Sequence, residues 1–454
     1  MSNADFAILI SCEETPRCTL AWLSALHHLC DCCSSCAHRR SLPSPPADSA
    51  RQAILTSAQA LFVRLSPLQM EAAIGALCSS LAIACAEWGL DTVMPSDARH
   101  ARVVRPSSDV LTHGESSNAA TTGHLMQRRL EAVGSDPKAS PASHIYAALL
   151  LVTLLLETQL PEALSRAVGG QAGSICTALL SALTRGLPAP PWAVASSTVN
   201  RSTGMGASAL GNYGGGPGGV PGATSTSDGF DAWSHAAACL AFRGVEALCA
   251  RRTLRLSQAH LAMAARAPLA RAPALARAAH RARARSPDDP AAVASIAAAA
   301  REASTACSAL QALLRHRSGG GARFLAHAAA ATAAIVRWVS RADLALGGSA
   351  AGPAPPRALA AEALSACAED LGTLMEELVQ DKRVASKYVP GVLATYIEEG
   401  MAPGGDDRGR VLSRTVGQAL RLGALCLYGA CGAREMQQVS DSALSTAVEM
   451  WAHG

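Results

Sequence analysis

Aromatic residues are scarce in this chain of 454 residues. Phe, Trp and Tyr make up 4% of the sequence, although hydrophobic residues together make up 49%. An interior built from this composition must be filled mainly by Ala, Leu and Val, which suits closely packed helices. No sustained alternation of apolar and polar residues is present, which argues against a half-buried β-sheet. We therefore expect an all-α protein.

Lysine is almost absent as well. Lys138, Lys382 and Lys387 are the only lysines among 39 basic residues, so arginine carries nearly all the positive charge. The arginines are spread over linkers and helices alike, which is typical of GC-rich coding more than of selection for phosphate contacts. The net charge of +4 permits contact with nucleic acid without arguing for it.

The sequence also lacks the motifs of common active sites. Neither glycine run, at 214–219 or at 319–321, ends in the Gly-Lys-Ser/Thr of a phosphate-binding loop. No Gly-x-Ser-x-Gly or His-Glu-x-x-His occurs. We therefore expect a protein that is not an enzyme, has no cofactor and binds no small-molecule substrate.

Membrane and secretion signals are missing too. The first residues do not form a basic segment followed by a clean apolar run. The most apolar segment, 145–156, is well short of the roughly 20 residues that span a bilayer. The 15 cysteines are scattered through apolar helical segments, which is typical of buried thiols in a reducing compartment. We expect a soluble intracellular protein without a membrane partner.

One cysteine cluster near the N-terminus could carry metal chemistry. Cys33 and Cys36 have the spacing of a zinc knuckle, and His28 and Cys32 are one helical turn apart. A structural zinc site needs a second ligand pair, but no further cysteine occurs before Cys78. The cluster can be interpreted as reduced thiols, as half of a zinc site or as a redox pair. We assign no metal ligand.

Three low-complexity segments divide the chain into helical blocks. A Pro-rich joint at 41–48 lies within the first block, and Ser66-Pro67 and Leu160-Pro161 mark turns between paired helices. Residues 230–285 read as one long helical region. The pattern predicts an irregular α-solenoid of antiparallel helix pairs with disordered Gly/Pro/Ser-rich linkers. The expected units are 1–94 (N-terminal helical block), 95–143 (polar linker), 144–186 (helical pair), 187–229 (disordered Gly/Pro-rich linker), 230–304 (Ala/Arg-rich helices) and 305–454 (C-terminal helical domain).

The densest positive stretch lies at 251–285, where no acidic residue occurs between Glu246 and Asp288. Such a segment could lie along RNA phosphates, or it could be an inert solvated helix face. Aromatic residues are absent from 243–323, so base stacking has no platform there. The candidates for RNA contact are Arg251, Arg252, Arg255, Arg277, Arg281, Arg283 and Arg285; Arg266 and Arg271 belong to the same stretch.

The C-terminal part carries a motif that begins Lys387-Tyr388-x-Pro390-x-x-Leu393-x-x-Tyr396 and continues with Gly423, Cys431 and Glu435. This pattern, over roughly residues 305–450, resembles the C-terminal domain of the unhealthy ribosome biogenesis protein 2 family. Tyr388, Leu393 and Tyr396 fall on related turns of one helix that begins near Pro390, so their first role is packing. Leu422, Leu425, Cys426 and the region 439–444 could form the complementary faces.

The resemblance implies a non-enzymatic helical scaffold that acts in nucleolar pre-rRNA processing and large ribosomal subunit assembly. Its implied partners are pre-ribosomal assembly factors and, as a further partner, pre-rRNA itself. Its implied location is the nucleus and the nucleolus. The alternative from the residues alone is a general protein-binding helical-repeat adaptor without a ribosomal connection.

Overall fold

The computed structural model describes residues 45–93, 141–184, 227–284, 289–317, 322–347, 355–380, 382–401, 412–432 and 436. Every regular element within these residues is a helix, which confirms the all-α prediction. The finer prediction of a solenoid stays a prediction. The linkers expected at 95–143 and 187–229 and the cysteine cluster lie wholly or largely outside the described residues.

The N-terminal helices confirm both turns that the prolines predicted. α4 begins at Pro67, and the Ser66 hydroxyl accepts a hydrogen bond from the Gln69 amide (3.3 Å) while the Gln69 side chain accepts one from the Ser66 amide (2.8 Å). This reciprocal capping box fixes the start of the helix. The helices of this part are α3 (Pro45–Phe62), α4 (Pro67–Val93), α6 (Pro141–Glu157), α7 (Glu162–Gly170) and α8 (Ala172–Thr184).

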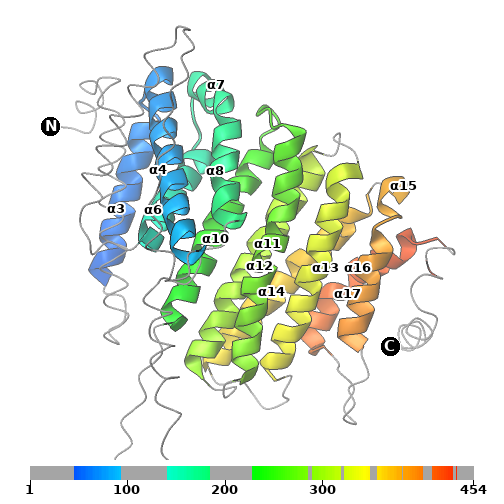
Figure 1. Cartoon of the computed structure of the whole chain (residues 1–454). Coiled ribbons are helices and arrows are strands. Elements are labelled where there is room, and N and C mark those ends of the chain that lie inside the picture. Colours follow the sequence, from blue (N-terminus) through cyan, green and yellow to red (C-terminus); the bar gives the residue numbers. More distant parts are fainter. Residues whose placement is uncertain are drawn as a thin grey trace, which may run out of the picture.

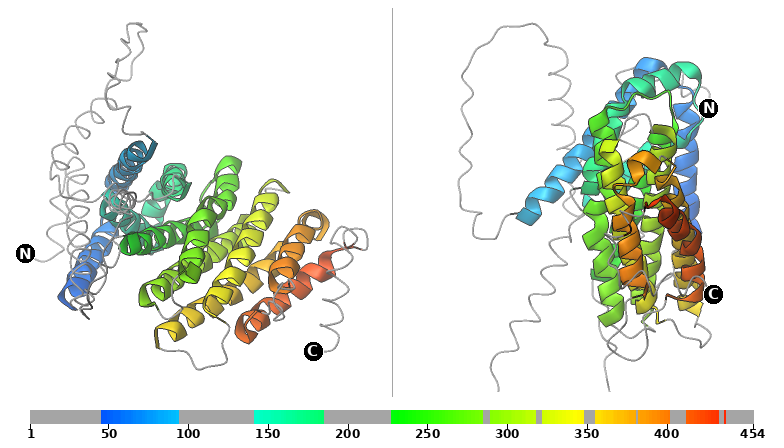
Figure 2. Two further views of the ribbon diagram at one scale, coloured as in Figure 1. Left: turned by 60° about the horizontal axis from the view of Figure 1, so that its bottom comes forward. Right: turned by 90° about the vertical axis from the view of Figure 1, so that its right-hand side faces the viewer.

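The remaining helices lie side by side in two layers (Figure 1). One layer continues from α6 through α10, α12, α14 and α17, and the other from α8 through α11, α13 and α16. The right-hand view of Figure 2 looks along this row and shows the two layers. The bounds are α10 (Ser227–Ala250), α11 (Gln258–Ala284), α12 (Pro290–Arg317), α13 (Ala322–Ala345), α14 (Pro355–Leu378), α15 (Lys382–Ala385), α16 (Val389–Met401) and α17 (Arg414–Ala430).

The single helical region expected over 230–285 is wrong, because the chain leaves the helix between α10 and α11. Ser257 starts α11 by accepting a hydrogen bond from the His260 amide (3.2 Å), which is an N-cap. Pro268 and Pro273 lie inside α11 without ending it. The boundary that the sequence suggested between residues 304 and 305 falls inside α12, which is one unbroken helix.

The interior between the layers is filled by small side chains, as the composition predicted. On α12, Ala299, Ala300, Ala303 and Cys307 are all completely buried. Small side chains let neighbouring helices approach closely, and they replace the aromatic residues that this chain lacks. The fold is therefore held by many Ala and Leu contacts along the whole row.

Candidate functional surfaces

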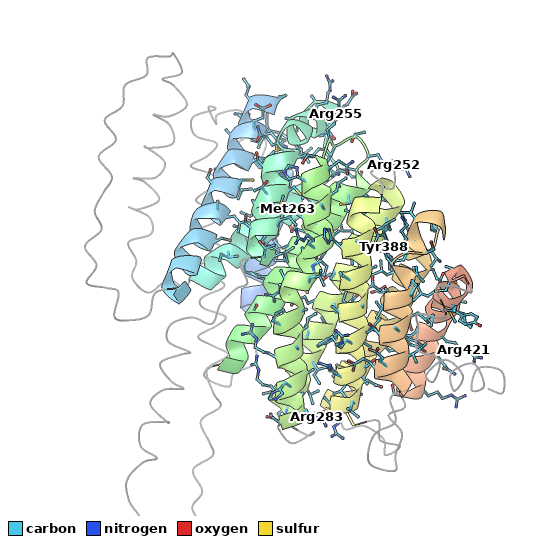
Figure 3. All side chains as sticks on the ribbon, turned by 45° about the vertical axis from the view of Figure 1, so that its right-hand side comes forward. Arg252, Arg255, Met263, Arg283, Tyr388 and Arg421 are labelled. Carbon is cyan, nitrogen blue, oxygen red and sulfur yellow. The ribbon has the colours of Figure 1, made fainter. Side chains whose placement is uncertain are left out.

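The exposed arginines of α11 and of the loop before it form what we call the arginine face. Figure 3 shows Arg252 and Arg255 near one end of α11 and Arg283 near the other. α11 has 27 residues and is therefore about 40 Å long. Arg266 and Arg277 are exposed between these ends. The face consists of Arg252, Arg255, Arg266, Arg277 and Arg283.

No acid among the described residues pairs with an arginine of this face. The positive charge of this face also affects α13. The pKa of His327 on that helix is lowered by partial burial and by the charge of nearby Arg266. Further along the same layer the arginines are paired, because Arg337 and Arg341 both bind Glu399 of α16 (3.2 and 3.0 Å). Within this layer, the exposed arginines without an acidic partner among the described residues therefore lie on α11 and in the loop before it.

Arg251 of the predicted RNA-contacting set, and Arg271 of the same stretch, have structural roles. Arg251 is half-buried and donates hydrogen bonds to the carbonyl oxygens of Leu156 and Thr158, where α6 ends. Burial lowers its pKa. The last four carbonyls of a helix lack helical partners, so Arg251 stabilises the end of α6 by donating to them. Its guanidinium group is therefore engaged in this contact and does not belong to the arginine face. Arg271 is buried in the core, and Arg281 is partly buried, while Arg285 lies outside the described residues.

Replacing Arg251 by Ala should destabilise the protein by about 1–3 kcal/mol, because the carbonyls at the end of α6 lose their donor. Arg252→Ala is the matched control, since that neighbouring side chain is exposed and should change stability by no more than about 0.5 kcal/mol. Urea denaturation followed by circular dichroism measures both values. Equal stability of the two variants would show that the Arg251 contacts do not hold α6.

A buried polar cluster joins α10, α11 and α12. The Arg271 guanidinium donates from Nε to Glu302 Oε1 (2.7 Å) and from Nη2 to Glu302 Oε2 (3.0 Å) and to Ser234 Oγ (3.0 Å). His235 Nδ1 donates to the second carboxylate oxygen of Glu302 at 2.5 Å. All four side chains are at most 5% exposed. Sequence reasoning missed this cluster because Glu302 is 31 residues away from Arg271.

Burial alone would raise the pKa of Glu302. The charge of Arg271 and the hydrogen bonds from His235 and Arg271 oppose this and leave that pKa below its ordinary value. Burial likewise opposes the charge of Arg271, but Glu302 raises the pKa of the guanidinium. Both groups are therefore charged and satisfied, and the cluster is a structural tie between three helices.

In the other layer, helix α14 carries mainly acidic side chains. Glu362 and Glu369 are exposed on α14, and Glu377 of the same helix binds Arg315 of α12 (2.6 Å). Asp370 accepts a hydrogen bond from the Ser304 hydroxyl, and its carbonyl accepts one from the Gln311 side chain (2.8 Å). α14 thus carries an acid-rich surface, whereas α11 carries exposed arginines.

The residues of the C-terminal motif lie mainly in the core. Pro390, Leu393 and Tyr396 are buried on α16, and Gly423 is buried on α17. Burial raises the pKa of Tyr396, although Arg421 opposes the shift. Lys387 is exposed, Tyr388 and Cys431 are partly buried, and Glu435 lies outside the described residues. The motif therefore builds the packing of α16 and α17, but the placement of Tyr388 on the same helix is wrong, because α16 begins at Val389.

Gly423 marks the closest approach between helices of this region. A Cβ atom on Gly423 would lie 2.6 Å from the carbonyl oxygen of Gly372 on α14, and one on Gly372 would lie 2.6 Å from that of Ala419. Glycine is required at both positions because no other residue leaves room for the two backbones. The sequence pattern singled out Gly423 but not its partner Gly372.

The described residues show no clustered metal ligands, since no group of three His, Cys, Asp or Glu side chains converges among them. Burial raises the pKa of Cys78 to about 11 and that of Cys176 to about 12, so these thiols stay protonated and are poor nucleophiles. Among the described helices none is by itself both long and apolar enough to cross a membrane. α7 and α8 meet that criterion only together, with a bend of 59° between them.

Comparisons with known proteins gave no similar protein. No family model matches the chain, and neither the curated proteins nor the solved structures yielded a match. The likeness of the C-terminal motif to the ribosome biogenesis family therefore depends only on the residues quoted above.

Proposed function

We propose that this protein is a non-enzymatic helical scaffold that acts in nucleolar pre-rRNA processing and large ribosomal subunit assembly. In this proposal the arginine face contacts the RNA backbone, and other surfaces bind pre-ribosomal assembly factors. The proposal has two supports, the arginine face and the family resemblance of the C-terminal motif. The first is a property of the structure, and the second is a property of the sequence.

The arginine face is the observation that carries the RNA-binding part of the proposal. Three of its five guanidinium groups are exposed on α11, which is about 40 Å long, and two are exposed in the loop before it. Acids among the described residues do not neutralise them. Guanidinium groups bind phosphate oxygens with two parallel hydrogen bonds and release condensed counterions from the nucleic acid. Because no aromatic residue occurs between residues 243 and 323, base stacking contributes nothing there. We therefore expect salt-dependent binding with little sequence preference.

A matched pair of double variants tests this part. Arg266→Ala/Arg277→Ala removes two charges from the arginine face, and Arg301→Ala/Arg414→Ala removes two exposed arginines from α12 and α17 in the other layer. The first double variant should reduce the slope of log affinity against log salt by about 1.5, because each lost phosphate contact contributes about 0.7–0.9. The second should leave the slope close to that of the unaltered protein.

The measurement is fluorescence anisotropy of a labelled RNA of mixed sequence at several salt concentrations. Equal losses in the two double variants would mean that only net charge matters. No loss in either would mean that the arginine face does not contact RNA. Either result would contradict the RNA-binding part of the proposal.

The second candidate is a protein-binding adaptor without a ribosomal connection. The observation that favours it is the acid-rich surface of α14, which exposes Glu362 and Glu369 and would suit a basic protein partner. A fluorescent fusion separates the two candidates in cells. The scaffold should concentrate in the nucleolus, whereas an adaptor of this second kind should not.

A further inference from the structure

α17 exposes a basic and apolar set of side chains. Arg414 and Arg421 are exposed, together with Leu422 (59% exposed) and Leu425 (41% exposed). The sequence of α17 contains no acidic residue, and neither arginine has an acidic partner among the described residues. A helix at the surface of a globular protein normally exposes polar side chains. These four residues, which we call the α17 face, therefore suit a partner that is both acidic and apolar.

α14 exposes the complementary set of side chains. Glu362 and Glu369 are exposed, and Leu359 is 64% exposed near the start of the same helix. Neither glutamate forms an ion pair within the part of the chain that the structure describes. The three residues follow one another at intervals of three and seven, so they share one side of the helix. We call these three residues the α14 face.

The charges of the two faces have the same spacing. Arg414 and Arg421 are seven residues apart in the sequence, and so are Glu362 and Glu369. Seven residues are nearly two turns of a helix, so each pair lies on one side of its helix with about 10.5 Å between its members. An α17 face laid against an α14 face can therefore form two arginine–glutamate pairs at once.

We infer that the α17 face of one copy of the chain binds the α14 face of a second copy, with the two helices antiparallel. In this order Arg414 of one copy lies opposite Glu369 of the other. Arg421 then lies opposite Glu362. Exposed ion pairs of this kind add little affinity, but they exclude surfaces of the wrong charge and fix the register.

The exposed leucines agree with the same register. With the helices antiparallel, Leu359 falls between Leu422 and Leu425, so these apolar side chains cover one another. In a parallel order that also pairs the charges, Leu425 would lie opposite Thr373 and Leu359 would lie beyond the start of α17. The antiparallel order therefore matches both the charges and the leucines, whereas the parallel order matches only the charges.

A second copy is favoured as the partner because this chain carries both halves of the contact. An unrelated partner would have to reproduce the spacing of the two glutamates and the position of the leucine. One contact involves only two helices and buries little surface, so we expect a dissociation constant in the micromolar range. This inference does not depend on the proposed function.

Sedimentation velocity of the full-length protein without RNA, over roughly 1–300 µM, tests the inference. The unaltered protein should self-associate, and added salt should weaken the association. Arg414→Glu/Arg421→Glu should raise the dissociation constant at least about tenfold, because acidic side chains then face one another. Glu362→Arg/Glu369→Arg should do the same, because basic side chains then face one another.

Mixing these two double variants separates specific pairing from a general effect of charge. Each variant alone has two faces of the same sign. In an equimolar mixture the acidic α17 face of the first variant meets the basic α14 face of the second, and the acidic α14 face of the first meets the basic α17 face of the second. The mixture should therefore associate at concentrations at which each variant alone is monomeric.

Two control variants lie away from the contact. Arg252→Glu/Arg301→Glu makes the same change in net charge at exposed arginines outside α14 and α17, and it should leave the dissociation constant unchanged. Leu425→Asp should weaken the association, whereas Leu68→Asp, at a leucine of α4 that is 69% exposed, should not. Circular dichroism checks that every variant is folded. A monomeric unaltered protein, a mixture that stays monomeric, or equal losses in the control variants would each overturn the inference.

Discussion

Replacing Arg271 by Met is expected to lower the free energy of unfolding by about 3–5 kcal/mol, because the change leaves the buried Glu302 carboxylate without its partner. Met preserves much of the volume of the arginine stem, so the loss reflects charge more than a cavity. Glu302 is completely buried and Arg271 is 3% exposed, so water cannot replace the missing guanidinium. Urea denaturation at neutral pH measures the effect.

The double variant Arg271→Met/Glu302→Leu is the control for this mechanism. It removes both charges, and a buried ion pair replaced by apolar residues is often close to neutral in stability. His235 then lacks its acceptor, which costs about 1–3 kcal/mol. We therefore expect the double variant to be more stable than Arg271→Met alone. If the double variant lost as much unfolding free energy as the two single variants Arg271→Met and Glu302→Leu added together, the role assigned to this pair would be contradicted.

The pH dependence of the same variants is set by the pKa of Glu302. Burial raises that pKa and Arg271 and His235 lower it by more, so the folded value lies below the ordinary one. The stability that this carboxylate contributes is present above its ordinary pKa and is lost as pH falls through the lowered value. In Arg271→Met burial acts without Arg271, so the pKa should rise. The deficit of that variant should then shrink as the pH is lowered.

Replacing Gly423 by Val is the second change with a large expected effect. Already its Cβ atom would lie 2.6 Å from the Gly372 carbonyl oxygen and 2.9 Å from the Cβ atom of Met375. Backbone cannot rotate away as a flexible side chain can, so α17 must separate from α14. Overpacking of this kind costs about 1–3 kcal/mol and more where the backbone must shift. We expect a loss of about 3 kcal/mol in chemical denaturation.

A second glycine of α17 supplies a control with the opposite sign. Nothing lies within 4 Å of a Cβ atom placed on Gly429, and that residue is exposed. Gly429→Ala should therefore stabilise the helix by up to about 1 kcal/mol, since alanine has the higher helix propensity. Gly423→Ala should be destabilising despite the same gain in propensity. Equal effects of the two Ala substitutions would show that α14 and α17 do not make the close contact.

The sequence predicted the helices of this protein well because their signals are local. The capping box at Ser66 and the prolines at positions 67 and 161 depend only on neighbouring residues. The break between α10 and α11 was missed although Ser257, the N-cap of α11, is a local signal. Arg251 at the break contacts the end of α6, about 95 residues earlier in the chain. Tertiary contacts of this kind leave no periodic signal.

The candidate surfaces were predicted only in part for the same reason. The sequence located the dense positive stretch at 251–285, but it could not distinguish exposed Arg277 from buried Arg271. Arg271 is buried because its partner Glu302 lies on another helix. The expected packing of Leu422 and Leu425 is not found among the described residues, where both side chains are exposed. Which side of a helix faces a neighbour is decided by the order of the helices in space, and the sequence pattern did not supply that order.

Crosslinking in cells followed by sequencing of the attached RNA and mass spectrometry of the attached peptides tests the central claim most directly. The account predicts enrichment of precursor ribosomal RNA over an untagged control, with crosslinked peptides from residues 252–283. No enrichment of precursor RNA, or crosslinks confined to the acid-rich surface of α14, would contradict it.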